Sequence, residues 1–255
     1  YHRLPCYSVP ALAGALDAVP DLAGIPIALP TTGDSVLARA REAVRRHGRA
    51  VVALSVMTCQ VGEMRRLIGR LRADCGPAVG VLAGGPHATA RPEDLLGAGA
   101  DAVFRGEAEA NFPGAIRDLA EGRAAAGVLS PPGTVCLDSA WSISPGRGMF
   151  GPIEITRGCA FACSYCQTSR IFGVRLRHRS VDSVVRQAEA LRSGNRKVVR
   201  LLSPNAFSYG SPDGRRLNLD AVRDLLSSLR RALTPKARIL FAHFPSEARP
   251  EHVTP

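Results

Sequence analysis

The fold of this chain is decided by one stretch of sequence, Thr156-Arg157-Gly158-Cys159-Ala160-Phe161-Ala162-Cys163-Ser164-Tyr165-Cys166-Gln167. It contains three cysteines in a C-x3-C-x2-C array, with an aromatic residue directly before the third. The stretch follows Pro152-Ile153-Glu154-Ile155-Thr156, whose alternation of apolar and polar residues predicts a strand that ends in a loop. The three thiols therefore lie on one loop at the end of a predicted strand.

Three thiolates on one loop can hold three irons of a 4Fe–4S cube, which leaves the fourth iron open to a small molecule. Packed or disulfide-bonded cysteines are one alternative. A zinc knuckle is another alternative, but zinc sites usually have four ligands in paired spacings. The sequence spacing from Cys166 to His178 fits no usual zinc finger. Seven cysteines with three of them clustered fit metal binding in a reducing compartment, so we favour the cluster.

This array resembles the signature of the radical S-adenosylmethionine (radical SAM) superfamily. The resemblance implies that Cys159, Cys163 and Cys166 ligate the cluster and that the open iron chelates the amino and carboxylate groups of SAM. One electron from the cluster then breaks the SAM carbon–sulfur bond and gives a 5'-deoxyadenosyl radical. The resemblance also places the backbone around Tyr165 beside the adenine and implies an electron donor such as flavodoxin or ferredoxin.

At 255 residues the chain predicts one large or two ordinary domains. No apolar run approaches the roughly 20 residues that span a bilayer, and no basic-then-apolar leader opens the chain. We therefore expect a cytoplasmic protein with no membrane partner. Because the chain begins at Tyr1 and stops at Pro255 without a tail, we also expect that both ends are cut.

The net charge of +11 is unevenly distributed: residues 1–150 carry a net charge of +1 and residues 151–255 carry +10. This positive field favours anionic ligands for the cysteine-bearing part and would suit nucleic acid. An acidic remainder of the protein is the alternative explanation. We expect a small-molecule or peptide substrate, and nucleic acid is not the favoured partner.

In the first half of the chain, strand and helix patterns alternate. Strands are predicted at 25–29, 50–56, 79–83 and 101–104, and helices at 9–18, 34–47, 61–71, after Pro92 and at 111–120. The alternation predicts an α/β domain over 1–124 with a doubly wound, Rossmann-like parallel sheet. Such sheets bind ligands beyond the carboxyl ends of their strands.

The predicted strand ends carry Met57-Thr58-Cys59, Gly84-Gly85-Pro86-His87-Ala88-Thr89 and Arg105-Gly106-Glu107-Ala108-Glu109. In combination they resemble the cobalamin (B12)-binding domain that precedes many radical SAM domains of the class B type. The Asp-x-His-x-x-Gly motif of many cobalamin domains is missing, since the only nearby candidate is His47-Gly48. The domain thus binds cobalamin without a histidine ligand, or binds nothing. By resemblance, the positions nearest the cofactor are Ser55, Thr58, Gly84, Gly85, Pro86, His87, Gly106 and Glu107.

Residues 125–150 are rich in Gly, Pro, Ser and Ala and predict a linker. Residues 151–255 predict three strand–helix units, with further strands at 197–202 and 238–241 and helices at 180–193 and 219–233. The resemblance makes this the first half of a radical SAM partial (β/α) barrel of the TIM type. Its strand ends are the cysteine loop, Ser203-Pro204-Asn205 and His243 to Arg249, where (β/α) barrels carry their chemistry.

In radical SAM proteins the loop after the second strand contacts SAM, so the resemblance implies, by position, that Ser203, Pro204 and Asn205 are SAM contacts. Four arginines precede the helix at 180–193, and the N-terminus of a helix suits a carboxylate or phosphate. Of these, Arg177 and Arg179 are predicted to touch SAM or an anionic substrate. A solvated basic crossover is the alternative for any one of them.

The sequence thus predicts a radical SAM enzyme that performs cobalamin-dependent C-methylation or related radical chemistry. One alternative is a methylthiotransferase that acts on tRNA or protein, with a second cluster on Cys6, Cys59 and Cys75. The predicted sheet puts Cys75 on the side opposite to Cys59, which disfavours a shared cluster. The other alternative is a non-catalytic iron–sulfur or cobalamin-binding regulator.

Overall fold

The computed structural model describes residues 7–241, 249 and 252, and these divide into two compact units. The first unit comprises residues 16–135. The second comprises residues 7–15 together with the described residues from 136 onward. The predicted domain limits at 124 and 150 stay predictions.

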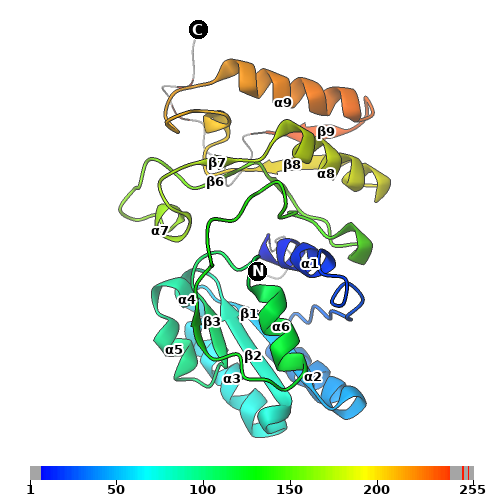
Figure 1. Cartoon of the computed structure of the whole chain (residues 1–255), viewed down its shortest axis with the longest axis vertical. Coiled ribbons are helices and arrows are strands. Elements are labelled where there is room, and N and C mark those ends of the chain that lie inside the picture. Colours follow the sequence, from blue (N-terminus) through cyan, green and yellow to red (C-terminus); the bar gives the residue numbers. More distant parts are fainter. Residues whose placement is uncertain (1–6, 242–248, 250–251, 253–255) are drawn as a thin grey trace. The chain divides into compact units, whose positions relative to one another are not determined.

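The first unit is built on a parallel four-stranded sheet with the order β1-β2-β3-β4 (Figure 1). On one face of β2, Val79, Val81 and Ala83 join the core formed by the inner stripe of α3 (Val61–Cys75). On the other face, Gly80 lies against Leu119 of α6 (Phe112–Ala120). Helices therefore cover both faces, which confirms the predicted α/β class. The strands are β1 (Ala50–Ser55), β2 (Val79–Gly84), β3 (Ala102–Phe104) and β4 (Gly127–Leu129).

Local sequence sets the helix ends of this unit. The side chain of Thr32 accepts a hydrogen bond from the Ser35 amide at 3.2 Å and caps α2 (Gly33–His47). Gly48 ends this helix with φ +76°, a conformation that glycine adopts without strain. The remaining helical segments are η1 (Thr58–Gln60), η2 (Gly76–Ala78), α4 (Pro86–Ala90) and α5 (Pro92–Leu96).

Two sequence predictions for this unit are wrong. Residues 25–29 do not form a strand, because Pro26 lacks an amide donor for a sheet ladder and Pro30 follows directly. Residues 127–129, predicted as linker, form β4 and pair with β3 through Val103 and Val128. A three-residue strand is too short to show a period of two in the sequence.

The second unit contains a parallel three-stranded sheet with the order β5-β8-β9 (Figure 1). The strands are β5 (Ile153–Glu154), β8 (Val198–Leu202) and β9 (Arg238–Leu240). The inner stripes of α8 (Val181–Ser193) and α9 (Leu219–Ala232) pack on Ile153, Val199 and Leu201 in one core. This succession of strands and helices confirms the predicted first part of a (β/α) barrel.

The remaining helical segments of this unit are α1 (Ser8–Asp17), of which residues 8–15 belong here, η3 (Pro145–Arg147), α7 (Thr168–Phe172) and η4 (Ala206–Ser208). Gly14 of α1 lies so close to the carbonyl oxygens of Trp141 and Ile143 that a side chain would collide with them.

The strand predicted at 152–156 is split at Ile155. Beyond it, β6 (Thr156–Arg157) turns away from the parallel sheet and pairs antiparallel with β7 (Arg177–His178). Ile155 links the two arrangements, since its amide donates to the Leu202 carbonyl and its carbonyl accepts from the Arg179 amide, both at 2.9 Å. The β6–β7 pair is therefore the base from which the cysteine loop projects.

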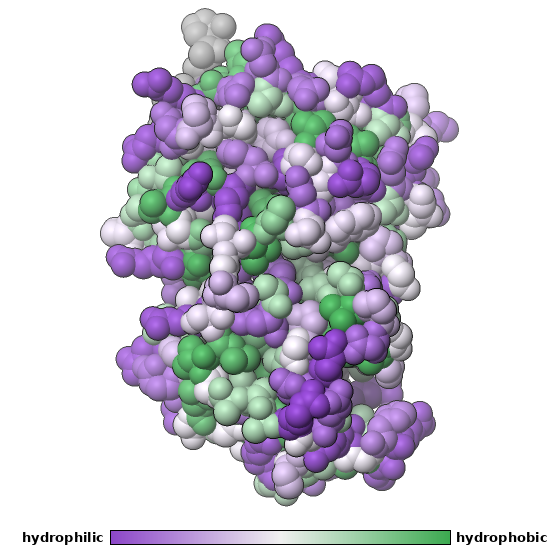
Figure 2. Space-filling model, in the orientation of Figure 1, coloured by the Kyte–Doolittle hydropathy of each residue, from purple (hydrophilic) through white to green (hydrophobic). Residues whose placement is uncertain are grey.

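Hydrophilic residues surround separate hydrophobic patches on the face of the molecule seen in Figure 2. None of the helices in the described residues has the length and apolar character needed to cross a membrane. The predicted cytoplasmic location stays a prediction.

Candidate cofactor sites

The cysteine loop is closed at its base by backbone contacts. The Cys159 amide donates to the Gly173 carbonyl at 3.1 Å, and the Ser169 hydroxyl donates to the Cys159 carbonyl at 2.9 Å. Gly158 has φ +89°, and a Cβ at this position would collide with the Arg175 carbonyl oxygen. The sequence Arg-Gly-Cys therefore needs its glycine for the close approach of the two ends of the loop.

Cys159, Cys163 and Cys166 are all free thiols of intermediate exposure. The Cys166 amide donates to the Cys163 carbonyl at 3.0 Å, so the C-x2-C part forms a turn. Within the described part of the chain, no three His, Cys, Asp or Glu side chains are gathered as a metal site. The donor set thus fits an iron–sulfur cluster in chemistry and chain position, although its side chains do not converge on one point. Their role as ligands stays a prediction.

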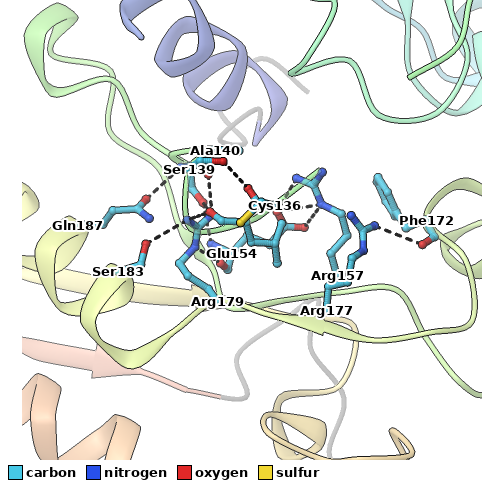
Figure 3. Close-up of polar contacts among 12 residues, drawn as sticks. Cys136, Ser139, Ala140, Glu154, Arg157, Phe172, Arg177, Arg179, Ser183 and Gln187 are labelled. Atoms are coloured by element: carbon cyan, nitrogen blue, oxygen red, sulfur yellow. Dashed lines mark hydrogen bonds and ion pairs between the residues drawn. The ribbon is translucent and has the colours of Figure 1, made fainter. Parts of the chain in front are cut away.

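An ion pair lies directly before this loop. The Arg157 guanidinium donates from Nε to both Glu154 carboxylate oxygens, at 3.0 and 3.1 Å, and from Nη2 to Oε2 at 2.6 Å (Figure 3). The side chains of Arg157 and Glu154 are only 7% and 18% exposed. The guanidinium also lies over the ring of Phe172, 5.3 Å from its centroid. Sequence reasoning missed this pair, although Glu154 precedes Arg157 by three residues in the predicted strand and loop.

Arg179 has a different role from the one predicted. Its side chain is buried, and the guanidinium donates to the carbonyl oxygens of Glu154 and Ala140, both at 2.8 Å, and to that of Leu137 (Figure 3). Burial lowers the pKa of Arg179 to about 10. Because these protein oxygens occupy the guanidinium, we correct the predicted SAM contact: Arg179 anchors the 137–142 segment to the barrel sheet.

The other predicted SAM contacts differ in what they can offer. Arg177 is half-buried and donates to the Phe172 carbonyl at 3.3 Å, and the Tyr165 side chain is 84% exposed. The Ser203 hydroxyl donates to the Asn205 carbonyl at 2.8 Å, next to the half-buried Pro204. Asn205 is 4% exposed, yet neither Oδ1 nor Nδ2 of its amide has a hydrogen-bond partner among the described residues. Since buried polar groups are rarely left unpaired, this amide is suited to a ligand.

Arg200 is a further candidate that the sequence did not reveal. In the sheet register Arg200 is paired with Leu240, and its neighbours Val199 and Leu201 face the helices. Arg200 therefore lies on the opposite face, which lines the inside of a (β/α) barrel. Its Nε is buried and makes no hydrogen bond within the part of the chain that the structure describes. Arg200 therefore places positive charge on the inner face, where it suits an anionic group.

In the first unit the structure brings the predicted cobalamin positions to one sheet edge. Ser55 and Gly84 are register partners at the ends of β1 and β2, and the Val56 amide donates to the Gly84 carbonyl at 2.8 Å. Gly85 has φ +97° and lies so close to Val56 that a Cβ would be 2.9 Å from its amide nitrogen. Pro86 then begins α4. The paired glycines thus keep the two strand ends in contact.

Thr89 ties this loop to the next and was missed. Its hydroxyl donates to the Gly85 carbonyl at 3.0 Å and accepts from the Gly106 amide at 3.1 Å. Gly106 has φ +85°, and the neighbouring Glu107 is 8% exposed. The predicted positions after β2 and β3 therefore form one connected rim. In the sequence, the threonine that ends Gly-Gly-Pro-His-Ala-Thr was the signal that this loop is tied to the next one.

His87 is part of the framework of this rim. It is 4% exposed, with Nδ1 3.3 Å from the Thr58 hydroxyl and Nε2 3.3 Å from an Asp94 carboxylate oxygen. Thr58 itself is exposed in η1, beyond the end of β1. Burial between two side chains suits a loop histidine better than a cobalt ligand. The rim therefore fits a corrin held by loops, without an axial histidine from this motif.

The cysteines of the first unit do not support a second cluster. Cys59 lies in η1 at the carboxyl end of β1, whereas Cys75 ends α3 just before the amino end of β2. These are opposite edges of the sheet, since β1 and β2 are parallel. The predicted third member, Cys6, lies outside the described residues.

Comparison with protein families identifies both units. Residues 20–116 match the family model of the B12 binding domain, and residues 153–245 match that of the radical SAM superfamily. The chain therefore carries a B12 binding domain followed by a radical SAM domain, as the sequence predicted. These families imply the expected cofactors, namely cobalamin, a 4Fe–4S cluster and SAM.

Among solved structures, the chain is similar to TsrM of Kitasatospora setae, a radical S-adenosylmethionine methyltransferase. The match has a TM-score of 0.60 at 20% identity and covers 90% of this chain and 51% of TsrM, which supports the fold. An uncharacterized methyltransferase of Pyrococcus horikoshii is 29% identical over 150 residues, 49% of this chain and 33% of that protein. A probable threonylcarbamoyladenosine tRNA methylthiotransferase of Archaeoglobus fulgidus is 38% identical over 74 residues, 29% of this chain and 17% of that protein. The chain thus spans a third or less of these two relatives.

Proposed function

We propose that this chain belongs to a cobalamin-dependent radical SAM enzyme that transfers a methyl group to carbon or performs related radical chemistry. The observation that carries the proposal is the cysteine loop, where three free thiols follow β6 inside the region that matches the radical SAM superfamily. A 4Fe–4S cluster bound with SAM supplies one-electron cleavage of the SAM carbon–sulfur bond. Cys159, Cys163 and Cys166 are the cluster ligands of this proposal.

In the same unit, the chain's task is to bind and orient SAM. Asn205 is the best-supported contact, because its buried amide offers one donor group and one acceptor that lack partners among the residues with described positions. Ser203 and Pro204 shape the backbone beside it, Tyr165 offers an exposed ring and backbone, and Arg177 adds positive charge at β7. We leave Arg179 out, since its guanidinium is occupied.

In the first unit, the rim at the sheet edge holds the corrin. The paired glycines after β2 let a large flat ligand approach the backbone closely. Thr89 fixes the two glycine loops relative to each other, and His87 braces Thr58. The proposed contacts are Ser55, Thr58, Gly84, Gly85, Pro86, His87, Gly106 and Glu107.

A small-molecule substrate fits a site in which a barrel sheet presents its inner face. Arg200 is the group we propose for an anionic part of that substrate, because its buried Nε has no partner in residues 7–241, 249 and 252. The net charge of +10 on residues 151–255 favours the same class of ligand. We further propose a small acidic electron donor such as flavodoxin or ferredoxin.

Similarity to methylthiotransferases favours a second candidate, a sulfur-inserting enzyme with two clusters. It requires three more cysteine ligands in the first unit, where Cys59 and Cys75 lie at opposite edges. Iron content separates the candidates, since one cluster gives about four irons per chain and two clusters give about eight.

The experiment is anaerobic reconstitution of the purified protein with iron and sulfide, followed by iron, sulfide and corrin analysis. About four irons, uptake of hydroxocobalamin and release of 5'-deoxyadenosine from SAM with dithionite are expected. Fewer than about three irons per chain would contradict the cluster assignment. A full cluster without corrin uptake would leave a plain radical SAM enzyme, and a cluster that never cleaves SAM would favour a regulator.

A further inference from the structure

The Glu154–Arg157 pair holds both ends of the cysteine loop. Arg157 comes two residues before Cys159, and its guanidinium stacks on Phe172, six residues after Cys166. Phe172 ends α7, and the next residue, Gly173, accepts the hydrogen bond from the Cys159 amide. Arg157 thus links the segment before Cys159 to the segment after Cys166, and all three thiols lie between these two segments.

Glu154 connects this contact to the barrel sheet. It is the last residue of β5, its amide nitrogen is 3.1 Å from the Ser142 hydroxyl oxygen, and its carbonyl accepts from the buried Arg179 (Figure 3). Its carboxylate takes the Nε and Nη2 edge of Arg157 as a fork, which fixes the plane of the guanidinium. The central carbon of the same guanidinium lies over the Phe172 ring. A lysine at position 157 would keep the charge but lose both the fork and the stacking.

The pair also sets the local charge. Both side chains are largely shielded from solvent, so their fields are screened less than those of surface groups. The reduction potential of an iron–sulfur cluster depends on nearby charge and hydrogen bonds. A positive charge stabilises the reduced, more negative cluster, and the carboxylate of Glu154 offsets that effect.

We propose that Arg157 is a positioning residue for the cysteine loop, and that the charge balance between Arg157 and Glu154 tunes the potential of the cluster bound there. The statement about the cluster potential rests on the proposed function, because it needs a bound cluster. The positioning role of Arg157 concerns the loop without any cofactor and does not depend on that function.

The first test uses the cluster-free protein and hydrogen–deuterium exchange of residues 158–173. Arg157→Lys and Phe172→Leu are expected to speed exchange several-fold in this segment, including the Cys159 amide, while α8 and α9 keep their protection. Arg170→Gln is the matched control, since Arg170 is an exposed arginine of the same loop. Exchange in the two variants that matches the control would overturn the positioning role.

The second test is a redox titration, followed by electron paramagnetic resonance, of the reconstituted protein. Glu154→Gln is expected to raise the midpoint potential and Arg157→Met to lower it, because they remove opposite charges; Arg170→Gln should leave it unchanged. A structural role alone would move the first two variants in the same direction, and that result contradicts charge tuning. If the unmodified protein takes up no cluster, the proposed function fails, while the exchange result stands by itself.

Discussion

The hydroxyl of Thr156 lies 3.0 Å from Nδ1 of His178, directly across the β6–β7 pair that carries the cysteine loop. On the other side of the ring, Nε2 lies 3.3 Å from the Ser211 carbonyl oxygen. Since a carbonyl only accepts, Nε2 carries a proton. Burial favours the neutral form of the ring, in which Nδ1 accepts from the Thr156 hydroxyl. The ring joins β6 and β7 to the loop after η4.

This arrangement predicts an acid-sensitive second unit. Burial lowers the pKa of His178 below its usual 6.5, although the contact with Ser211 opposes the shift. A histidine whose folded pKa is depressed contributes stability that is complete above the unfolded pKa. That stability is lost as the pH falls through the folded pKa. The thermal unfolding midpoint should therefore drop as the pH is lowered from about 7 to about 5.

The comparison that isolates this effect is His178→Gln. The variant should unfold at a lower temperature at pH 7 but lose less of its midpoint on acidification. His47→Gln, at the exposed end of α2, is the matched control and should follow the unmodified protein. Equal pH slopes in the protein and in His178→Gln would show that His178 does not carry the acid sensitivity.

The cysteine array predicts that cluster binding needs the three thiols of the array and does not need Cys136. Alanine at position 159, 163 or 166 should each abolish the cluster, because a cube held by two thiolates lacks a third anchor. Iron and sulfide content and the visible absorption after reconstitution measure this loss. Cys136→Ala is the control in the same unit, since Cys136 is exposed outside the array. The amides of Ser139 and Asp138 lower the pKa of Cys136, which favours its thiolate. Retention of the cluster in this variant would show that the cluster does not need this thiolate.

Replacement of Gly158 is predicted to destabilise the protein, because a side chain at this position collides with its neighbours. Alanine there adopts a left-handed φ and must push back the Arg175 carbonyl, so Gly158→Ala should destabilise the protein by about 2–3 kcal/mol. Gly148 also has a positive φ, +66°, but open space around it. Gly148→Ala should therefore cost only about 1 kcal/mol. Equal losses in chemical denaturation would show that strain, and not the clash, decides the effect.

The sequence predicted most of what depends on neighbouring residues. The helices predicted at 34–47 and 180–193 form as α2 and α8, and the cysteine loop follows a strand end as expected. The errors concern partners that are distant in the chain. Arg179 was predicted to bind a ligand, but its guanidinium bonds to carbonyl oxygens 39 and 42 residues away. Burial and long-range partners of this kind leave no local pattern.

The same limit explains the candidate sites. The positions after β1, β2 and β3 were predicted because parallel strands end at one edge, which is a property of the fold. The orphaned groups of Asn205 and Arg200 became visible only with burial and sheet register. Asn205 was suggested by position alone, and Arg200 was not suggested, because an isolated arginine in a strand gives no signal.

Thr89 predicts how the cobalamin rim is held together. Thr89→Val keeps the shape of the side chain but removes the hydrogen bonds to the Gly85 carbonyl and from the Gly106 amide. The loss should cost about 1–2 kcal/mol of stability and weaken hydroxocobalamin binding, measured by spectrophotometric titration of the purified protein. Thr89→Ser retains the hydroxyl and should bind almost as well as the unmodified protein. Gly76→Ala, a strained glycine at the opposite end of β2, controls for lost stability, because it should destabilise the unit without changing corrin affinity. Corrin binding by Thr89→Val that equals that of Thr89→Ser would mean that the rim does not need this tie.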